Sequence, residues 1–199
     1  MQAKSRKLLF RTVLVATSIL YLLGLYYYLS GRVFQEKMGE RYDSTPEGGI
    51  DFTKPGYPNF LRDVSGLSNS EHWGRWSDAK DAGEKVRLTF VKPLPKKFVL
   101  ELKLKAYGSN QLEPIAILLG EEKFELRLNP NIANDKIQTI LVNIEQKQSL
   151  PPADSIILVP PKPTSPPKPP DFNPSNPGRT DQRLLGIGLV NLRIMNAQY

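Results

Sequence analysis

The chain has 199 residues, no cysteine, one histidine and a formal net charge of +7. The absence of cysteine excludes a disulfide framework, a thiolate metal site and a cysteine nucleophile. The single histidine, His72, excludes multi-histidine metal centres, whereas carboxylate metal sites and serine or carboxylate catalysis remain open. At roughly 100–200 residues per domain, this length predicts one folded unit with attachments.

An apolar segment near the N-terminus predicts a membrane anchor. Residues 12–31 carry no charged side chain, and a helix of this length, at about 1.5 Å per residue, spans one hydrocarbon core of about 30 Å. Residues 1–11 contain four basic side chains and no acidic one, which predicts a cytoplasmic tail and an outward-facing remainder of the chain. This tail carries +4 of the net charge of +7. The excess of basic residues is therefore explained mostly by the predicted orientation in the membrane.

Two alternatives to the transmembrane signal-anchor at 12–31 are a cleaved signal peptide and a buried core helix. A signal peptide has a shorter apolar run, of about 7–15 residues, and a cleavage site with small residues. Here the run ends in Tyr26, Tyr27 and Tyr28, whose rings suit the membrane interface. Beyond the anchor, charged residues and Gly and Pro clusters predict a connector over 32–59 and a folded domain over 60–199.

Short alternating segments in the domain predict β-strands with one buried face. At least seven follow one another, at residues 86–91, 98–105, 115–119, 123–128, 137–144, 155–159 and 185–194. The third and fourth are separated by a short turn, which predicts a hairpin with Phe124, Leu126 and Leu128 facing the core. Gly186 and Gly188 in the last segment predict a bulge or a close backbone contact.

This series of strands, without an amphipathic helix after residue 40, predicts an all-β fold. We expect an antiparallel β-sandwich, jelly-roll-like, preceded by one N-terminal transmembrane helix. Between Pro160 and Pro177, nine of 18 residues are proline, so segment 160–177 cannot be a helix or a central strand. It is predicted to be a stiff surface loop; the alternative is a recognition segment for a PxxP-binding domain.

The densest group of chemically active side chains lies before the first of these strands. Its candidate ligand-binding residues are Glu71, His72, Trp73, Arg75, Trp76 and Asp78. Tryptophan rings stack on the apolar face of sugars, and Arg, Glu and Asp bind hydroxyl or anionic groups, so the pattern favours a glycan or a phosphorylated polyol. In the structural alternative, the tryptophans plug the end of the sandwich and Arg75 pairs with Glu71 or Asp78.

A resemblance to a known family rests on several short motifs. They are Gly66-Leu67-Ser68, Glu71, Trp73-Gly74-Arg75-Trp76-Ser77, Pro93-Leu94-Pro95 and Arg183-Leu184-Leu185-Gly186-Ile187-Gly188-Leu189. Over roughly residues 50–196 the chain resembles the accessory β-sandwich domain of bacterial phosphoglycerol transferase I, a periplasmic glucan-modifying enzyme, and related accessory domains of envelope glycosyltransferases. The catalytic domain of that enzyme needs several Asp and His metal ligands. With one histidine and no room for such a domain, the chain is expected to be the accessory module alone.

The leading hypothesis is therefore a non-catalytic accessory protein of the bacterial inner membrane, with a cytoplasmic N-terminus and a periplasmic domain. Its expected partners are a periplasmic glucan or other envelope glycan and a membrane transferase, and its expected role is to assist glucan or surface-polysaccharide modification. A second hypothesis is a purely protein-binding tether or regulatory subunit of such a transferase. A third is a small envelope hydrolase or transferase that uses Glu71, His72 and Asp78. No cofactor or metal is expected, and no nucleic acid, because no recognised fold or basic groove accompanies the charge.

Overall fold

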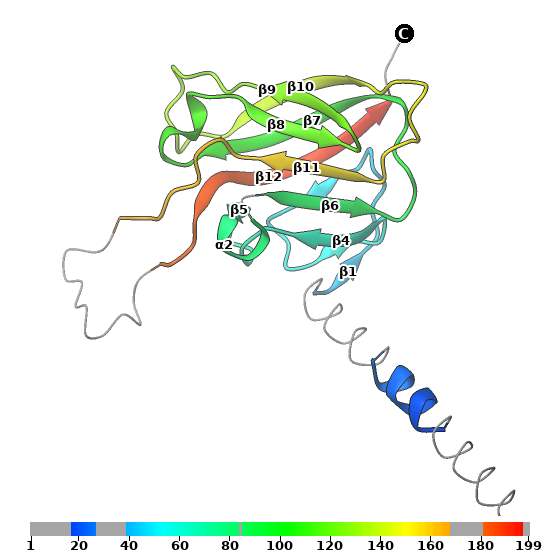
Figure 1. The fold of residues 1–199 in the computed structure, drawn as a ribbon. Helices are drawn as coiled ribbons and strands as arrows, with labels where there is room; N and C mark the ends of the chain where they lie inside the picture. The colour runs from blue at the N-terminus through cyan, green and yellow to red at the C-terminus, as the bar shows by residue number, and fades with distance from the viewer. Residues whose placement is uncertain (1–16, 27–38, 84, 168–180, 197–199) are drawn as a thin grey trace, which may run out of the picture. The chain divides into compact units, whose positions relative to one another are not determined.

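The computed structural model describes residues 17–26, 39–83, 85–167 and 181–196 (Figure 1). The chain divides into two compact units, Met1–Gly39 and Glu40–Tyr199. In the first unit, residues 17–26 are helical. Within the described ranges, no helix has both the length and the apolar character needed to cross a membrane. The predicted tail at 1–11 and the two ends of the predicted anchor lie outside the described residues.

The regular secondary structure described in the second unit is almost entirely β-strand (Figure 1). The strands are β1 (Arg41–Tyr42), β2 (Ile50–Asp51), β3 (Tyr57–Pro58), β4 (Leu61–Ser65), β5 (Arg75–Asp78), β6 (Val86–Phe90), β7 (Lys97–Ala106), β8 (Ile115–Leu119), β9 (Glu122–Leu126), β10 (Gln138–Glu145), β11 (Ser155–Val159) and β12 (Leu185–Asn196). Two short helical turns, α2 (Ala79–Ala82) and η1 (Gly108–Gln111), interrupt them.

Ten of these strands form two five-stranded sheets. In the first, here called the β7 sheet, the order is β10-β7-β12-β2, and β5 also pairs with β12. In the second, the β11 sheet, the order is β4-β6-β11-β8-β9. All pairs in both sheets are antiparallel, and β1 and β3 form a separate parallel pair. The predicted antiparallel β-sandwich is therefore confirmed.

Buried and outward-facing side chains alternate strictly along β7, so one face of its sheet belongs to the core. Leu100, Leu102 and Leu104 are fully buried, whereas the side chains between them face outward. The inward residues of β11 and β6 are buried in the same way. Because successive side chains of a strand point to opposite faces, each sheet presents one apolar face to the other sheet.

The strands predicted from alternation are present, with ends that differ by a few residues. β8 and β9 pair as the predicted hairpin. Leu126 and Leu128 are buried as predicted, but Phe124 is only half-buried, because β9 is the edge strand of its sheet.

Strands β1, β2 and β3 lie within the segment that the sequence predicted as a connector, and β4 and β5 were not predicted. β1, β2 and β3 have two residues each, too few to show a period of two. Their pairing partners are distant in sequence: β2, for example, pairs with β12 through Asp51 and Asn191. Only the folded chain therefore reveals them.

The proline segment is described up to residue 167, and residues 168–180 lie outside the described ranges. Thr164 bridges to Leu185 through two backbone hydrogen bonds of 2.9 Å. The chain then returns as β12, which lies inside the β7 sheet.

The pairing of β12 with β5 shifts register between Leu185 and Gly188, and a Cβ on Gly186 would lie 2.4 Å from Pro160 Cβ. Both features confirm the prediction made from the two glycines.

Candidate functional site

The tryptophan motif folds back on itself and presents aromatic rings on the outer face of the β7 sheet. Bridges between Leu67 and Ser77 and between Glu71 and Gly74 hold this turn. At the end of the turn, Trp76 on β5 lies opposite Gly188 of β12. Lys105 of β7 lies opposite the same glycine on its other side. These residues alternate with buried ones, so their side chains face outward.

Three aromatic rings form a contiguous cluster here, called the aromatic platform: Trp73, Trp76 and Tyr107. The ring centroids of Trp73 and Trp76 are 4.8 Å apart at an interplanar angle of 64°. Those of Trp76 and Tyr107 are 5.5 Å apart at 79°. Both are edge-to-face geometries, and all three residues are half-buried. The platform is therefore partly fixed by packing and partly accessible to solvent.

Gly188 makes room for this platform. A Cβ atom at this position would lie 2.6 Å from Cη2 of Trp73 and 3.0 Å from Cζ3 of Trp76. Real Cβ contacts are longer, because close-packed interiors do not tolerate such overlap. A side chain at position 188 would therefore displace the two indole rings.

Lys105 covers part of the platform. Its Nζ atom lies 3.5 Å from the ring centroid of Trp73 and 4.9 Å from that of Trp76, within the range of a cation–π interaction. Burial lowers the pKa of Lys105, while the carboxylates of Glu71 and Asp135 act in the opposite direction. Among the described residues, no carboxylate lies within ion-pair distance of this amine.

A charged network orients Trp73. The indole Nε1 donates a hydrogen bond of 2.8 Å to Glu71 Oε2, and Arg183 Nη1 donates one of 3.0 Å to Glu71 Oε1. Arg183 also donates to Asp181, at 2.6 Å from Nη2 to Oδ2. These bonds to Asp181 raise the pKa of Arg183, and the same pairing lowers the pKa of Asp181. Glu71 is thereby engaged on both oxygens.

Two of the predicted site residues lie in the interior instead. Arg75 is 6% exposed, and its Nη2 donates hydrogen bonds of 2.8 and 2.7 Å to the carbonyls of Lys54 and Pro55. Asp78 is 8% exposed, and its Oδ1 accepts from the backbone N–H groups of Lys80 and Leu184. Arg75 thus pairs with neither Glu71 nor Asp78, contrary to the structural alternative, because backbone carbonyls take its hydrogen bonds.

The motif therefore separates into three groups, of which Arg75 and Asp78 form the interior one. Glu71, Trp73 and Trp76 lie together at the platform, whereas His72 is exposed at the turn. Among the residues that the structure describes, no three His, Asp or Glu side chains are grouped so that they could hold a metal ion.

Polar side chains continue from the platform across the outer face of the β7 sheet. One row is formed by Thr139, Lys103, Asn191 and Asp51, which are direct cross-strand partners on β10, β7, β12 and β2. The next row is formed by Glu101 and Arg193, with the apolar Leu141 beside Glu101 on β10. Arg193 Nη1 lies 3.4 Å from Glu101 Oε1. We call these two rows the polar rows; they extend the platform into a surface with hydrogen-bond donors and acceptors.

Sequence reasoning did not identify Lys105, Tyr107, Gly188 or the polar rows as part of a site. Alternation over 98–105 does predict that Glu101, Lys103 and Lys105 face outward. It does not reveal that β12 and β5 pair beside β7, which is what brings the aromatic rings to these charges.

The fold and this outer face define the class of the protein: an antiparallel β-sandwich with an aromatic platform on one sheet. The family model "Domain of unknown function (DUF7024)" matches residues 36–196. The chain belongs to this family.

The chain is also similar to phosphoglycerol transferase I of Escherichia coli, Citrobacter koseri and Shigella boydii. Each is 33% identical over 147 residues, which cover 74% of this chain and 17% of the relative. The chain thus spans 17% of the length of these curated relatives. The resemblance inferred from the tryptophan motif is confirmed.

Comparison with solved structures gives low-scoring similarity to carbohydrate binding modules. A carbohydrate binding module of family 29 superposes with a TM-score of 0.45 at 17% identity, covering 74% of this chain and 85% of that chain. A mutant of the module CBM29-2 complexed with cellulohexaose has a TM-score of 0.44 at 18% identity, covering 74% of this chain and 87% of that chain.

Proposed function

We propose that the domain is a non-catalytic module that binds an envelope glycan through the outer face of the β7 sheet. The observation that carries this proposal is the aromatic platform, in which Trp73 and Trp76 are fixed by packing and hydrogen bonds but remain half-buried rather than buried. Preorganised aromatic rings lose little conformational entropy when a ligand stacks on them, which favours binding.

The polar rows supply the second requirement of glycan recognition. Neighbouring strands are about 4.8 Å apart, and side chains on one face of a strand repeat about every 7 Å. A saccharide lying across the platform would therefore meet amide, carboxylate and amine groups at regular intervals along its length. Lys103, Asn191 and Glu101 are in these positions.

The positions of the predicted acid–base residues favour binding over catalysis. General acid–base catalysis needs two groups directed at one reacting position. Asp78 instead accepts two backbone N–H groups inside the fold, and Glu71 is held by Trp73 and Arg183. Both side chains are therefore held by hydrogen bonds within the fold.

In the cell, we propose that residues 12–31 anchor this module in the inner membrane, with residues 1–11 in the cytoplasm and the domain in the periplasm. The module would present a glycan to a separate membrane transferase and so assist glucan modification. Support comes from the apolar segment of the sequence and from the similarity to a part of phosphoglycerol transferase I.

The test is a calorimetric titration of the full chain with a periplasmic glucan, with and without phosphoglycerol substituents. We expect Trp76→Ala to weaken binding about tenfold, a loss of about 1.4 kcal/mol, because the variant loses one stacking surface. Ile157→Ala is the matched control, since Ile157 is a half-buried outward residue of the β11 sheet, and it should bind as the wild type does.

An unchanged dissociation constant for a folded Trp76→Ala variant would contradict glycan binding by the platform. If the wild-type chain binds no glucan but crosslinks to a transferase in intact membranes, the domain is a protein-binding tether instead.

A further inference from the structure

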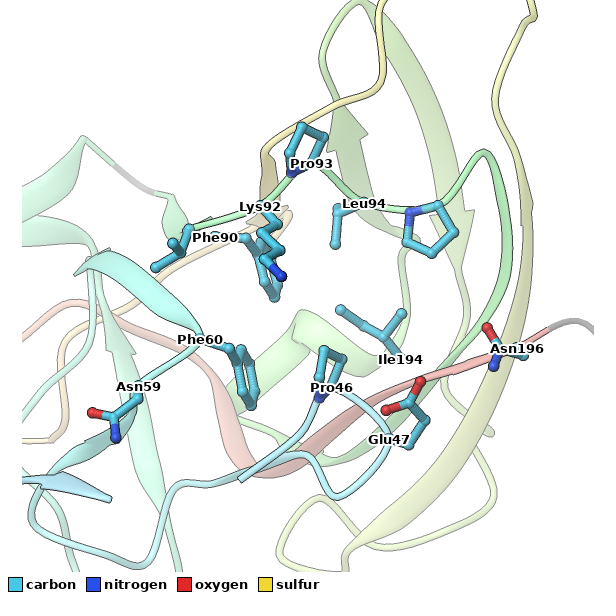
Figure 2. Close-up of a pocket in the computed structure, with 12 residues that line it drawn as sticks. Pro46, Glu47, Asn59, Phe60, Phe90, Lys92, Pro93, Leu94, Ile194 and Asn196 are labelled. Carbon is cyan, nitrogen blue, oxygen red and sulfur yellow. The ribbon is translucent and has the colours of Figure 1, made fainter. Parts of the chain in front are cut away.

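A concave site lies at the end of the sandwich, far along β12 from the platform. It is a cavity of about 510 Å³, called here the end cavity, lined by residues of the β1–β2, β3–β4 and β6–β7 regions and by the C-terminal end of β12. Phe60 and Phe90 line one side, with ring centroids 6.1 Å apart and nearly parallel planes. Figure 2 shows these rings facing Leu94 and Ile194 across the cavity. The volume is that of a ligand site.

The wall of the end cavity offers few hydrogen bonds to a ligand. Three of its residues, Pro46, Pro93 and Pro95, have no backbone N–H. The backbone N–H groups of four others are already used: Phe90 donates to Asp154, Val91 to Phe60, Leu94 to Ala153 and Ile194 to Pro46. The carbonyl of Pro95 accepts from Gln146.

Because most of these backbone groups are absent or already hydrogen-bonded, the wall favours a ligand that needs few hydrogen bonds. A peptide backbone or a sugar would lose its hydrogen bonds to water and regain few inside the end cavity, at a cost of about 1–3 kcal/mol for each group left unpaired. A hydrocarbon has no such groups to satisfy, and its transfer from water into this wall is favourable.

The rim of the end cavity carries one charge of each sign. Lys92 and Glu47 lie on different sides of it (Figure 2). Both side chains are exposed. Neither forms a side-chain hydrogen bond or ion pair with any residue that the structure describes, so both are available to an outside group. An apolar interior with a cation and an anion at its mouth is complementary to an amphiphile with a zwitterionic head group.

We propose that the end cavity binds the hydrocarbon chain of a zwitterionic phospholipid, with Lys92 facing its phosphate and Glu47 its ammonium group. This inference rests on the anchoring part of the proposed function, which supplies the lipid surface. Pro46 follows the end of the apolar segment by 15 residues, a length of chain that spans at most about 50 Å, so a bilayer lies within reach.

The test uses the full chain in phosphatidylcholine nanodiscs that contain phosphatidylethanolamine with a photoreactive diazirine on its acyl chain. After illumination, crosslinked peptides are mapped by mass spectrometry. We expect crosslinks in two regions, at 12–31 from the anchor and at 90–95 from the end cavity. Val91→Asp should reduce the second set about tenfold and leave the first unchanged, because Val91 lines the cavity and a carboxylate there opposes an apolar chain.

Leu112→Asp is the matched control. Leu112 is 65% exposed and Val91 57%, and Leu112 is not among the lining residues, so its variant should crosslink as the wild type does. Crosslinks at 12–31 without crosslinks at 90–95 would overturn the inference and keep the anchor. The reverse pattern would overturn the anchor and keep the cavity as a lipid site. Unchanged crosslinking in a Lys92→Gln, Glu47→Gln double variant would overturn the inference that these two side chains bind a zwitterionic head group.

Discussion

Arg75 and Tyr57 lie against each other in the interior, with the guanidinium carbon of Arg75 4.4 Å from the centre of the Tyr57 ring. This contact gives Arg75 a structural role in the core, although its position between two tryptophans in the sequence made it a candidate ligand-binding residue. Tyr57 is only 3% exposed. Burial raises the pKa of Tyr57 to about 12, and the charge of Arg75 acts in the opposite direction.

This tyrosine makes stability depend on pH in the alkaline range. Between its ordinary pKa of 10.0 and the raised value of about 12, the unfolded chain loses the phenol proton while the folded chain keeps it. The folded state then binds more protons, so the free energy of unfolding falls as pH rises. The whole contribution is about 3 kcal/mol, fully present below pH 10 and lost progressively toward pH 12.

We therefore expect urea denaturation to show a steeper loss of stability with pH for the wild type than for Tyr57→Phe. The variant keeps the ring but has no proton to lose, and all other titrating groups are common to both proteins. Parallel stability curves between about pH 9 and pH 12 would refute the assignment.

At the scale of elements, β12 connects the site to the rest of the sheet. Two of its neighbours, β7 and β5, carry Lys105 and Trp76, and both of these residues pair with Gly188. Next to this point Ser77 Oγ accepts the N–H groups of Gly186 and Ile187, at 3.1 and 2.9 Å, where the regular ladder is interrupted. The backbone N–H groups at the irregular pairing are therefore satisfied by Ser77. Because Gly188 has no side chain, the indole rings pack directly against the backbone of β12.

Gly188→Ala should disturb this arrangement. The new methyl group would overlap Trp73 and Trp76, so we expect a loss of stability of about 1–3 kcal/mol. The near-UV circular dichroism of the tryptophans should change as well, because the rings must move.

Gly120→Ala is the comparison. Gly120 has a φ of +58°, and a methyl group there would have no neighbouring atom within 4 Å, so alanine costs about 1–2 kcal/mol through backbone strain alone. It should leave the tryptophan spectrum unchanged. The same spectrum in Gly188→Ala and the wild type would show that the rings do not depend on this glycine.

For the whole molecule, the decisive feature is that the last strand lies in the interior of a sheet. β12 pairs with β7, β5 and β2, which come from three distant parts of the chain. Residues 40–199 form one compact unit that holds all the strands among the described residues. The proline segment therefore connects two strands of this unit, β11 and β12, and does not mark the C-terminal boundary of the unit.

We expect a protein of residues 40–199 to unfold at the same temperature as the full chain. A protein of residues 40–160 should lack cooperative unfolding, because it loses β12 and exposes the inner face of the β7 sheet. Differential scanning calorimetry distinguishes the two outcomes. A cooperative transition for residues 40–160 would contradict the central role of β12.

Strong local patterns made much of this fold predictable. Alternation over five to ten residues, as in β7 and β11, is set by which side chains must be buried, and it is visible without knowing the partner strand. The two-residue strands β1, β2 and β3 have no such signal. Their backbone groups find partners only after the longer strands have assembled.

The sequence by itself determined the sandwich class, the long strands, the final return of the chain, and Trp73 and Trp76 as unusual residues. Tertiary structure decided which members of the motif face the outer surface. Arg75 and Trp76 are adjacent on β5, so the period of a strand sends one to the interior and the other to the outer face. Lys105, Tyr107 and Arg183 join the tryptophans only through strand pairing and long-range contacts. A single sequence does not encode such register in a form that can be read locally.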